Sequence, residues 1–268
     1  MNCNNISVEK LKNLINKKIE ISLFDCLKST NLTAKQKAED GAPEGSIIIA
    51  RSQTGGRGRL GRSFYSPEKS GVYFSLILKP DFSPEDITFI TPITAVAVSL
   101  AIEKITKKPT GIKWVNDIFV NGKKVCGILS EAVFSSELNK FKYIILGIGI
   151  NLFTPENGFP DDIKDIAGGL LKNGEEIDIN SLLAQIFNNF FEMYKSLKSP
   201  EYLTAYREHL MLKNKEVTYI QNGKTQKGTI LDIDESFSLI IKNESGKKVH
   251  LKSGEVTIGS KEALKNEL

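Results

Sequence analysis

The stretch "QTGGRGRLGR", Gln53 to Arg62, places three arginines and four glycines in one short segment. Before it lies "SIIIARS", a run typical of a buried strand, and after it "GVYFSLILKP" alternates like a second strand. Glycines leave the backbone free to approach a ligand, and the guanidinium forks of arginine suit phosphate or carboxylate. The sequence therefore predicts an anion-binding loop carried between two strands.

The loop fits neither of the common phosphate motifs. No Gly-Lys-Ser/Thr follows, as a P-loop requires, and a strand rather than a helix comes next, which argues against a dinucleotide fingerprint. A nucleic-acid segment of the Arg-Gly-Gly kind stays open, although such segments lie in long disordered tracts. A solvated surface loop with structural ion pairs is the other alternative.

Composition narrows the class of protein. The 268 residues carry 36 Lys and Arg against 32 Asp and Glu, so the net charge of +4 does not by itself imply a nucleic-acid binder. The three cysteines, Cys3, Cys26 and Cys126, support neither a disulfide framework nor a CxxC metal site, which favours a reducing cytoplasm. No signal peptide is visible, and we expect no window near the roughly 18 apolar residues of a membrane span.

Periodicity predicts a mixed α and β chain without internal repeats. The expected helices cover Val8 to Asn16 after a Ser7 cap, the stretch from Ser29 to a stop at Gly41, Ile87 to Ile105, and an apolar face from Leu182 to Leu197 capped by Asn180 or Ser181. A hairpin is expected to turn at Asn121 and Gly122, and "KYIILGIGINL" is expected to form a core strand.

From about Asn214 the pattern changes to short strands separated by turns, which indicates a small separate β-barrel. We therefore divide the chain into residues 1–213 and residues 214–268. Neither His209, in a helical stretch, nor His250, in a terminal strand, has the partners of a catalytic histidine, and Trp114 is expected to pack in the core.

Five motifs occur in one order: "STN" at Ser29 to Asn31, the arginine loop, "KWVND" at Lys113 to Asp117, "GKKVCGIL" at Gly122 to Leu129 and "GIGINL" at Gly147 to Leu152. Together they resemble the biotin protein ligases, from about Ile19 to Gly259. The resemblance implies an α+β fold: a catalytic domain like that of class II aminoacyl-tRNA synthetases, followed by an SH3-like β-barrel.

The resemblance also implies a two-step reaction. Biotin and MgATP give biotinyl-5'-adenylate and pyrophosphate, and a lysine of a biotin carboxyl carrier protein then attacks the acyl carbon and releases AMP. A glycine-rich loop that folds over the reactive anhydride would shelter it from water, so we expect the loop to be mobile without ligand and ordered with the adenylate.

Site residues follow from the same resemblance. Lys124 and Arg59 are expected to be catalytic, as cations that neutralise charge at the α-phosphate. The biotin-binding residues are Ser29, Thr30, Asn31, Gln53, Arg57, Gly58, Arg59, Lys124 and Gly127, with Gly147 and Gly149 as close-approach positions; the ATP-binding residues are Gly56, Arg59, Arg62, Lys124, Asn116 and Asn151. Helix capping by Ser29 to Asn31 is compatible with these roles. Asp117 is a candidate to hold Mg²⁺ through water, and no metal ligand is otherwise identified.

Two other functions fit the same sequence features, and the chain differs from bifunctional members of the family. A lipoate protein ligase shares this fold and chemistry, and a nucleic-acid-binding protein would use the same loop in another way. About eighteen residues precede Ile19, too few for the helix-turn-helix domain of bifunctional family members, so we expect a monofunctional ligase without operator binding. A monomer and a homodimer paired through sheet edges would give the same sequence pattern.

Overall fold

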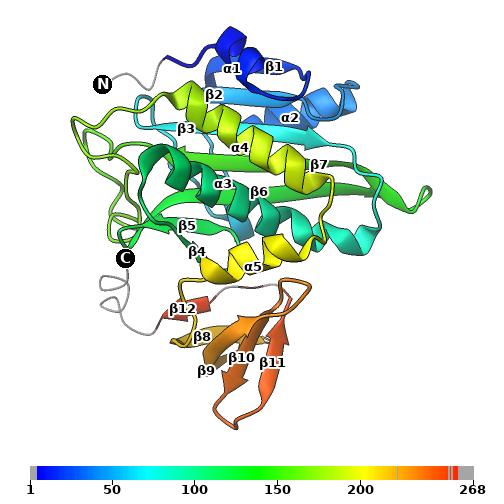
Figure 1. Cartoon of the computed structure of the whole chain (residues 1–268), viewed down its shortest axis with the longest axis vertical. Helices are drawn as coiled ribbons and strands as arrows, with labels where there is room; N and C mark the ends of the chain where they lie inside the picture. Colours follow the sequence, from blue (N-terminus) through cyan, green and yellow to red (C-terminus); the bar gives the residue numbers. More distant parts are fainter. Residues whose placement is uncertain (1–4, 222, 253, 255, 259–268) are drawn as a thin grey trace.

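The computed structural model describes residues 5–221, 223–252, 254 and 256–258. Cys3 and residues 259–268 of the predicted second domain therefore lie outside the described residues. The chain forms two sheets, one of seven strands and one of five, and helices cover the larger one (Figure 1).

The seven-stranded sheet has the order β1-β2-β3-β7-β6-β5-β4. Its strands are β1 (Ile21–Leu27), β2 (Ile47–Gln53), β3 (Gly71–Leu78), β4 (Gly111–Lys113), β5 (Asp117–Val120), β6 (Lys123–Ser135) and β7 (Lys140–Asn151). Only β1 and β2 run parallel, joined by a helix, and every other neighbouring pair is antiparallel. The predicted turn at Asn121 and Gly122 is confirmed, and both residues have the positive φ that a two-residue hairpin turn requires.

Helices lie on both faces of this sheet. They are α1 (Val8–Leu14), α2 (Thr30–Glu39), α3 (Ile90–Thr106), α4 (Ile179–Tyr194) and α5 (Pro200–Glu208), with short 3₁₀ turns η1 (Arg59–Gly61) and η2 (Pro84–Phe89). The large core joins α1, α3 and α4 to one face of β2, β3, β6 and β7. The opposite face holds a smaller core, in which Ala34 and Ala38 of α2 pack on Ile48, Ile77 and Ile145. Small alanines let α2 approach the sheet closely.

Two details correct the sequence predictions. The cap of α4 is Asp178, whose carboxylate accepts the Asn180 N–H at 3.0 Å, rather than Asn180 or Ser181. The Asn180 side chain instead accepts the Ser7 N–H and donates to the Asn5 carbonyl, so it fastens the N-terminal segment. The expectation about apolar windows is also wrong, because Pro84–Thr106 is long and apolar enough to cross a membrane by length and composition; 67% of its most apolar window is buried inside the protein.

The C-terminal domain is a five-stranded antiparallel sheet of order β11-β10-β9-β8-β12, and it confirms the predicted SH3-like unit. Its strands are β8 (Glu216–Gln221), β9 (Lys224–Ile233), β10 (Leu239–Asn243), β11 (Lys248–Leu251) and β12 (Val256–Ile258). Phe237, in the β9–β10 turn, packs against Phe89 and Tyr206, and its carbonyl accepts the Trp114 indole N–H at 2.9 Å. Trp114 is buried, as predicted, at this contact between the domains.

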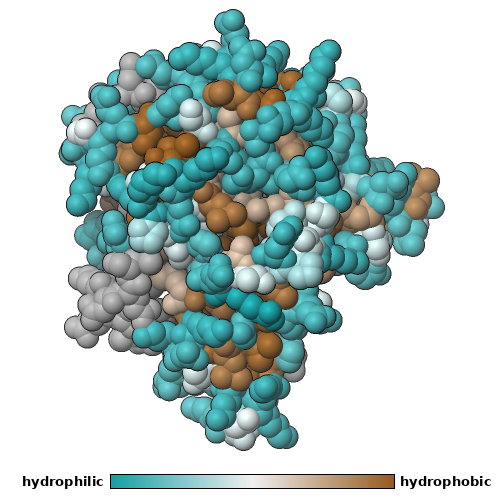
Figure 2. All heavy atoms as spheres, in the orientation of Figure 1, coloured by the Kyte–Doolittle hydropathy of each residue, from teal (hydrophilic) through white to brown (hydrophobic). Residues whose placement is uncertain are grey.

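The outer surface is mostly hydrophilic on the face shown in Figure 2. An exception is the β6–β7 hairpin, which projects beyond the helices and carries the exposed Phe134 and Leu138. The sheet face on which α2 packs also carries a pocket beside that helix.

Candidate active site

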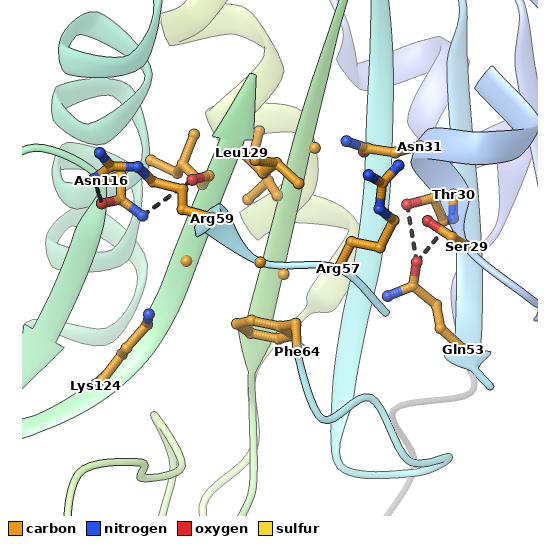
Figure 3. A pocket seen from close by; sticks show the side chains of 16 residues that line it. Ser29, Thr30, Asn31, Gln53, Arg57, Arg59, Phe64, Asn116, Lys124 and Leu129 are labelled. Atoms are coloured by element: carbon orange, nitrogen blue, oxygen red, sulfur yellow. Dashed lines mark hydrogen bonds between the residues drawn. The ribbon is translucent and has the colours of Figure 1, made fainter. Parts of the chain in front are cut away.

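A pocket lies on the α2 face of the large sheet, under the arginine loop. Its lining comes from the start of α2, the end of β2, the arginine loop and the residues after it, the residue before β5, the first half of β6 and the second half of β7. The lining residues are Ser29, Thr30, Asn31, Gln53, Arg57, Gly58, Arg59, Phe64, Asn116, Lys124, Gly127, Ile128, Leu129, Gly147, Ile148 and Gly149. Figure 3 shows Ser29, Thr30 and Gln53 at one end, Arg59, Asn116 and Lys124 at the other, and Phe64 between them.

The floor of the pocket is built from glycines on neighbouring strands. Gly127 pairs with Gly149, and Gly147 pairs with Leu129, so these positions face the pocket side by side. A Cβ on Gly149 would lie 2.5 Å from the Phe64 ring, and one on Gly147 would overlap the Asn31 side chain. The glycines are therefore required for close approach, as predicted for this strand pair.

The end of the pocket beside α2 is a buried network of neutral hydrogen bonds. Gln53 Oε1 accepts the Thr30 N–H at 2.8 Å and the Thr30 hydroxyl at 3.1 Å, and Gln53 Nε2 donates to Ser66 Oγ at 2.9 Å. The Ser75 hydroxyl lies 2.6 Å from Asn31 Oδ1 and 2.8 Å from Thr30 Oγ1. Ser29 occupies the N-cap position of α2, but its side chain makes no capping hydrogen bond. Hydroxyl and amide groups thus converge on this end from three elements.

The opposite end carries two cations, each held by a protein group. Lys124 Nζ lies 2.7 Å from Asp117 Oδ1. Arg59 donates to Asn116 Oδ1 at 2.7 Å and to the Gly254 carbonyl at 3.1 Å, so it joins the loop to both domains. The backbone of Lys124 is also fixed, since its N–H donates to the Ile166 carbonyl and its carbonyl accepts the Gly168 N–H. This end therefore presents fixed positive charge.

Thiol and phenol groups near this end do not add charge. Burial raises the pKa of the Cys126 thiol well above its usual range, so this cysteine is protonated and is not a nucleophile. Burial also raises the pKa of Tyr206 well above its usual range, and the Asp117 charge acts in the same direction. The ion pairs at the pocket are Arg57–Glu131 and Lys124–Asp117, whereas Arg59 is held by the neutral Asn116 and Gly254.

Most of the predicted site residues come together in this pocket, but three do not line it. Gly56 and Arg62 line a neighbouring cavity of about 560 Å³, between the arginine loop and Pro160 to Ile163. A Cβ on Gly56 would overlap the Phe64 carbonyl, so Gly56 shapes the loop. Asn151 is buried at the end of β7, where its carbonyl accepts the Leu170 N–H. Their ATP-binding roles stay predictions.

The sequence predictions gave no role to several residues of this site, among them Phe64 and Glu131. Phe64 lies on Gly149 and Gly127, and Glu131 pairs with Arg57 at 3.0 Å. Glu131 follows Gly127 and Leu129 at a period of two on β6, and this alternation is a signal that could have placed it on the same face of the strand. Nothing comparable marks Phe64, because it lies in a loop.

Comparison with known proteins defines the class. Residues 23–151 match the Biotin/lipoate A/B protein ligase family, and residues 214–259 match the Biotin protein ligase C terminal domain. A bifunctional ligase/repressor BirA of Bacillus spizizenii is 36% identical over 241 residues, which cover 88% of this chain and 73% of that protein. The match to the Bacillus subtilis protein of that name, 43% identical over 172 residues, spans 52% of its length.

Similar solved structures are also biotin protein ligases. The biotin protein ligase from Aquifex aeolicus in complex with biotin and ATP has a TM-score of 0.72 and 28% identity, with 89% of this chain and 97% of that chain covered. Among the relatives found by sequence, a biotin–[acetyl-CoA-carboxylase] ligase of Mycobacterium tuberculosis is 25% identical, and the match covers 85% of both chains. This chain therefore belongs to the biotin protein ligase family.

Proposed function

We propose that this chain activates biotin with ATP and transfers the biotinyl group to a lysine of a biotin carboxyl carrier protein. One observation carries the proposal: a single glycine-floored pocket joins a buried hydroxyl and amide end to an end with Arg59 and Lys124. The ureido ring of biotin has one carbonyl acceptor and two N–H donors, which the first end complements. Its carboxylate and the ATP phosphates suit the second.

The chemistry of the first step requires concentrated positive charge. A biotin carboxylate oxygen attacks the α-phosphorus, a new P–O bond forms, and the bond to the pyrophosphate leaving group breaks. Negative charge grows on the α-phosphate as two anions meet, and fixed cations stabilise it without reorganising. Lys124 and Arg59 supply those cations.

The second step consumes the adenylate. The acceptor amine attacks the acyl carbon, the C–O bond to AMP breaks, and the amine loses its proton. Water competes for the same carbon, so the anhydride must be covered until the acceptor arrives. Arg57, Gly58 and Arg59 of the arginine loop line the pocket, and this position supports a covering role for the loop.

Magnesium enters this proposal as part of the substrate MgATP. Within residues 5–221, 223–252, 254 and 256–258, no group of three or more His, Cys, Asp or Glu side chains is arranged to hold a metal ion. Asp117, the predicted candidate, faces Lys124 and accepts a hydrogen bond from Asn116 at 2.9 Å. ATP phosphates and water would therefore supply most of the Mg²⁺ ligands.

Loop opening is part of the proposal as well. The pocket encloses about 50 Å³ under the loop, far less than the several hundred Å³ of a typical small-molecule site. Leu60, at the loop tip, is 72% exposed, so its side chain packs against little of the protein. We infer that the loop opens to admit biotin and closes over the adenylate.

The test is biotin-dependent exchange of labelled pyrophosphate into ATP by the purified chain. We expect exchange with biotin, none with lipoate, and thermal stabilisation by biotin alone. Stabilisation by lipoate alone would favour the lipoate ligase alternative. Strongly salt-dependent RNA or DNA binding with no exchange would instead favour the nucleic-acid-binding alternative.

A further inference from the structure

Glu131 lies between two hydrogen-bond donors at the edge of the pocket. Its Oε2 accepts from Asn31 Nδ2 at 2.7 Å, and its Oε1 lies 3.0 Å from a guanidinium nitrogen of Arg57. Asn31 is 5% exposed, whereas the side chains of Glu131 and Arg57 are 35% and 49% exposed. Glu131 thus connects a buried residue of α2 to a half-exposed residue of the arginine loop.

The same contacts continue through the buried end of the pocket. The Ser75 hydroxyl donates to Asn31 Oδ1 at 2.6 Å, which fixes the direction of the Asn31 amide, and it lies 2.8 Å from Thr30 Oγ1. Thr30 donates to Gln53, Gln53 donates to Ser66, and Ser66 donates to the Phe64 carbonyl. The chain of contacts therefore starts at Arg57, in the arginine loop, and ends at Phe64, two residues after it in the same connection between β2 and β3.

Only a carboxylate satisfies both neighbours of Glu131. Asn31 Nδ2 and the Arg57 guanidinium are both donors, and Glu131 offers one acceptor oxygen to each. A glutamine at this position would turn its own NH₂ group toward one of the donors. Arginine carries five N–H donors, so the pair with Glu131 orients Arg57 and leaves donors for an incoming carboxylate.

We propose that Glu131 is a positioning residue that couples the ring end of the biotin pocket to the arginine loop. This inference rests on the proposed function. With Glu131 in place, Arg57 is held over the pocket before biotin binds, so little side-chain entropy is lost on binding. Without it, Arg57 is a half-exposed flexible side chain that the buried Asn31 no longer holds in place through Glu131.

The first test compares Glu131→Gln with Glu137→Gln, a matched change at the exposed tip of the same hairpin. In biotin-dependent pyrophosphate exchange, Glu131→Gln should raise the KM for biotin about tenfold and change kcat by less than about twofold, because binding rather than the transition state is affected. Glu137→Gln should match the wild type. A fall in kcat with an unchanged KM, or equal behaviour of the two variants, would overturn the inference.

A double-mutant cycle with Arg57→Gln tests the coupling itself. Calorimetry measures the Kd for biotin in all four proteins of the cycle. Glu131→Gln should raise this Kd about tenfold when Arg57 is present and less than about twofold when the protein also carries Arg57→Gln. Additive effects would overturn the coupling. Melting temperatures of all variants show whether any loss reflects folding.

Trypsin reports on the loop without activity. Cleavage after Arg57, Arg59 or Arg62 should be about tenfold faster in Glu131→Gln than in Glu137→Gln, and unchanged cleavage would contradict the role. If the wild type neither binds biotin nor shows exchange, the proposed function fails. If it does both while the two variants agree in every measurement, only the role of Glu131 fails.

Discussion

The two ends of the pocket are built in different ways. At the α2 end, Thr30 and Asn31 are buried; Thr30 is held by neutral hydrogen bonds with Gln53 and Ser75, and Asn31 by Ser75 and the Glu131 carboxylate. At the other end, Lys124 and Arg59 are partly exposed and are held by Asp117, Asn116 and a carbonyl of the C-terminal domain. One end is set by packing and the other by polar pairs at the surface of the pocket.

This difference assigns different tasks to the two ends. Buried neutral groups keep their geometry without a ligand, which suits recognition of an uncharged ring. The Lys124–Asp117 ion pair is partly exposed and contributes little to stability, but it holds a cation in a fixed place where negative charge develops in the reaction. Mutations at the first end should strongly weaken biotin binding. Mutations at the second end should remove positive charge and lower the reaction rate.

Gly147→Ala should have the largest effect. A methyl group at this position overlaps the Asn31 side chain inside the buried network, where neither side can yield. We expect biotin binding to weaken by more than about 100-fold in calorimetry. Melting temperatures of the wild type and Gly147→Ala show whether the variant is folded. Normal binding by Gly147→Ala would show that the floor is not part of the ring site.

Lys124→Ala should come next and should act on rate. Loss of a fixed cation at a developing negative charge costs about 10²- to 10³-fold in kcat. Biotin-dependent exchange should fall by that factor while the protein melts as a folded chain. Lys140→Ala, at the exposed start of β7, should keep full activity. If Lys124→Ala lost only affinity for biotin, the catalytic assignment would be wrong.

Much of the architecture of the two pocket ends could be predicted from the sequence, because the patterns that reveal it are local. Alternation, the Asn-Gly turn and the glycine-arginine loop each report on a few neighbouring residues, so β2, β3 and the β5–β6 hairpin were predicted. The motifs also predicted that Thr30, Gln53, Arg59 and Lys124 would share one pocket.

The sequence did not predict the hydrogen-bond and ion-pair partners of these residues. Asn180 is a good cap residue by type, yet the fold uses its side chain to hold Ser7 and Asn5, and Asp178 caps α4 instead. The pairing of Glu131 with Arg57 joins positions 74 residues apart, and that of Arg59 with Gly254 joins the two domains. Such contacts depend on tertiary packing, which leaves no local pattern.

A change in ionic strength should also distinguish the two ends of the pocket, with a smaller effect on binding than the mutations above. Between about 0.05 M and 0.5 M KCl, the Kd for biotin should rise about threefold, because salt screens the attraction between a carboxylate and partly exposed cations. Biotinol, which has the ring but no carboxylate, should change by less than about 1.5-fold. Calorimetry with both ligands makes the measurement. Equal salt dependence would remove the distinction between a neutral end and a charged end.

The smallest expected effect lies behind the charged end, where Glu103 fixes the start of β4. Burial raises the pKa of Glu103, but the hydrogen bonds from Thr110 and the nearby His209 outweigh it, and the net pKa lies below its ordinary value of 4.5. A lowered pKa means that the folded state binds this proton less tightly than the unfolded state, so the stabilisation is present above pH 4.5. It is lost as the pH falls through the folded pKa.

Glu103→Gln should therefore lower the melting temperature by about 2 °C at pH 7, and the difference from the wild type should shrink below about pH 4. Glu137→Gln, exposed on the hairpin, serves as the control at each pH. Exchange activity at pH 7 should fall by less than about twofold, because Glu103 contacts Thr110 and not the pocket. A melting difference that stays constant from pH 7 to pH 3.5 would mean that the effect of Glu103 is packing and not charge.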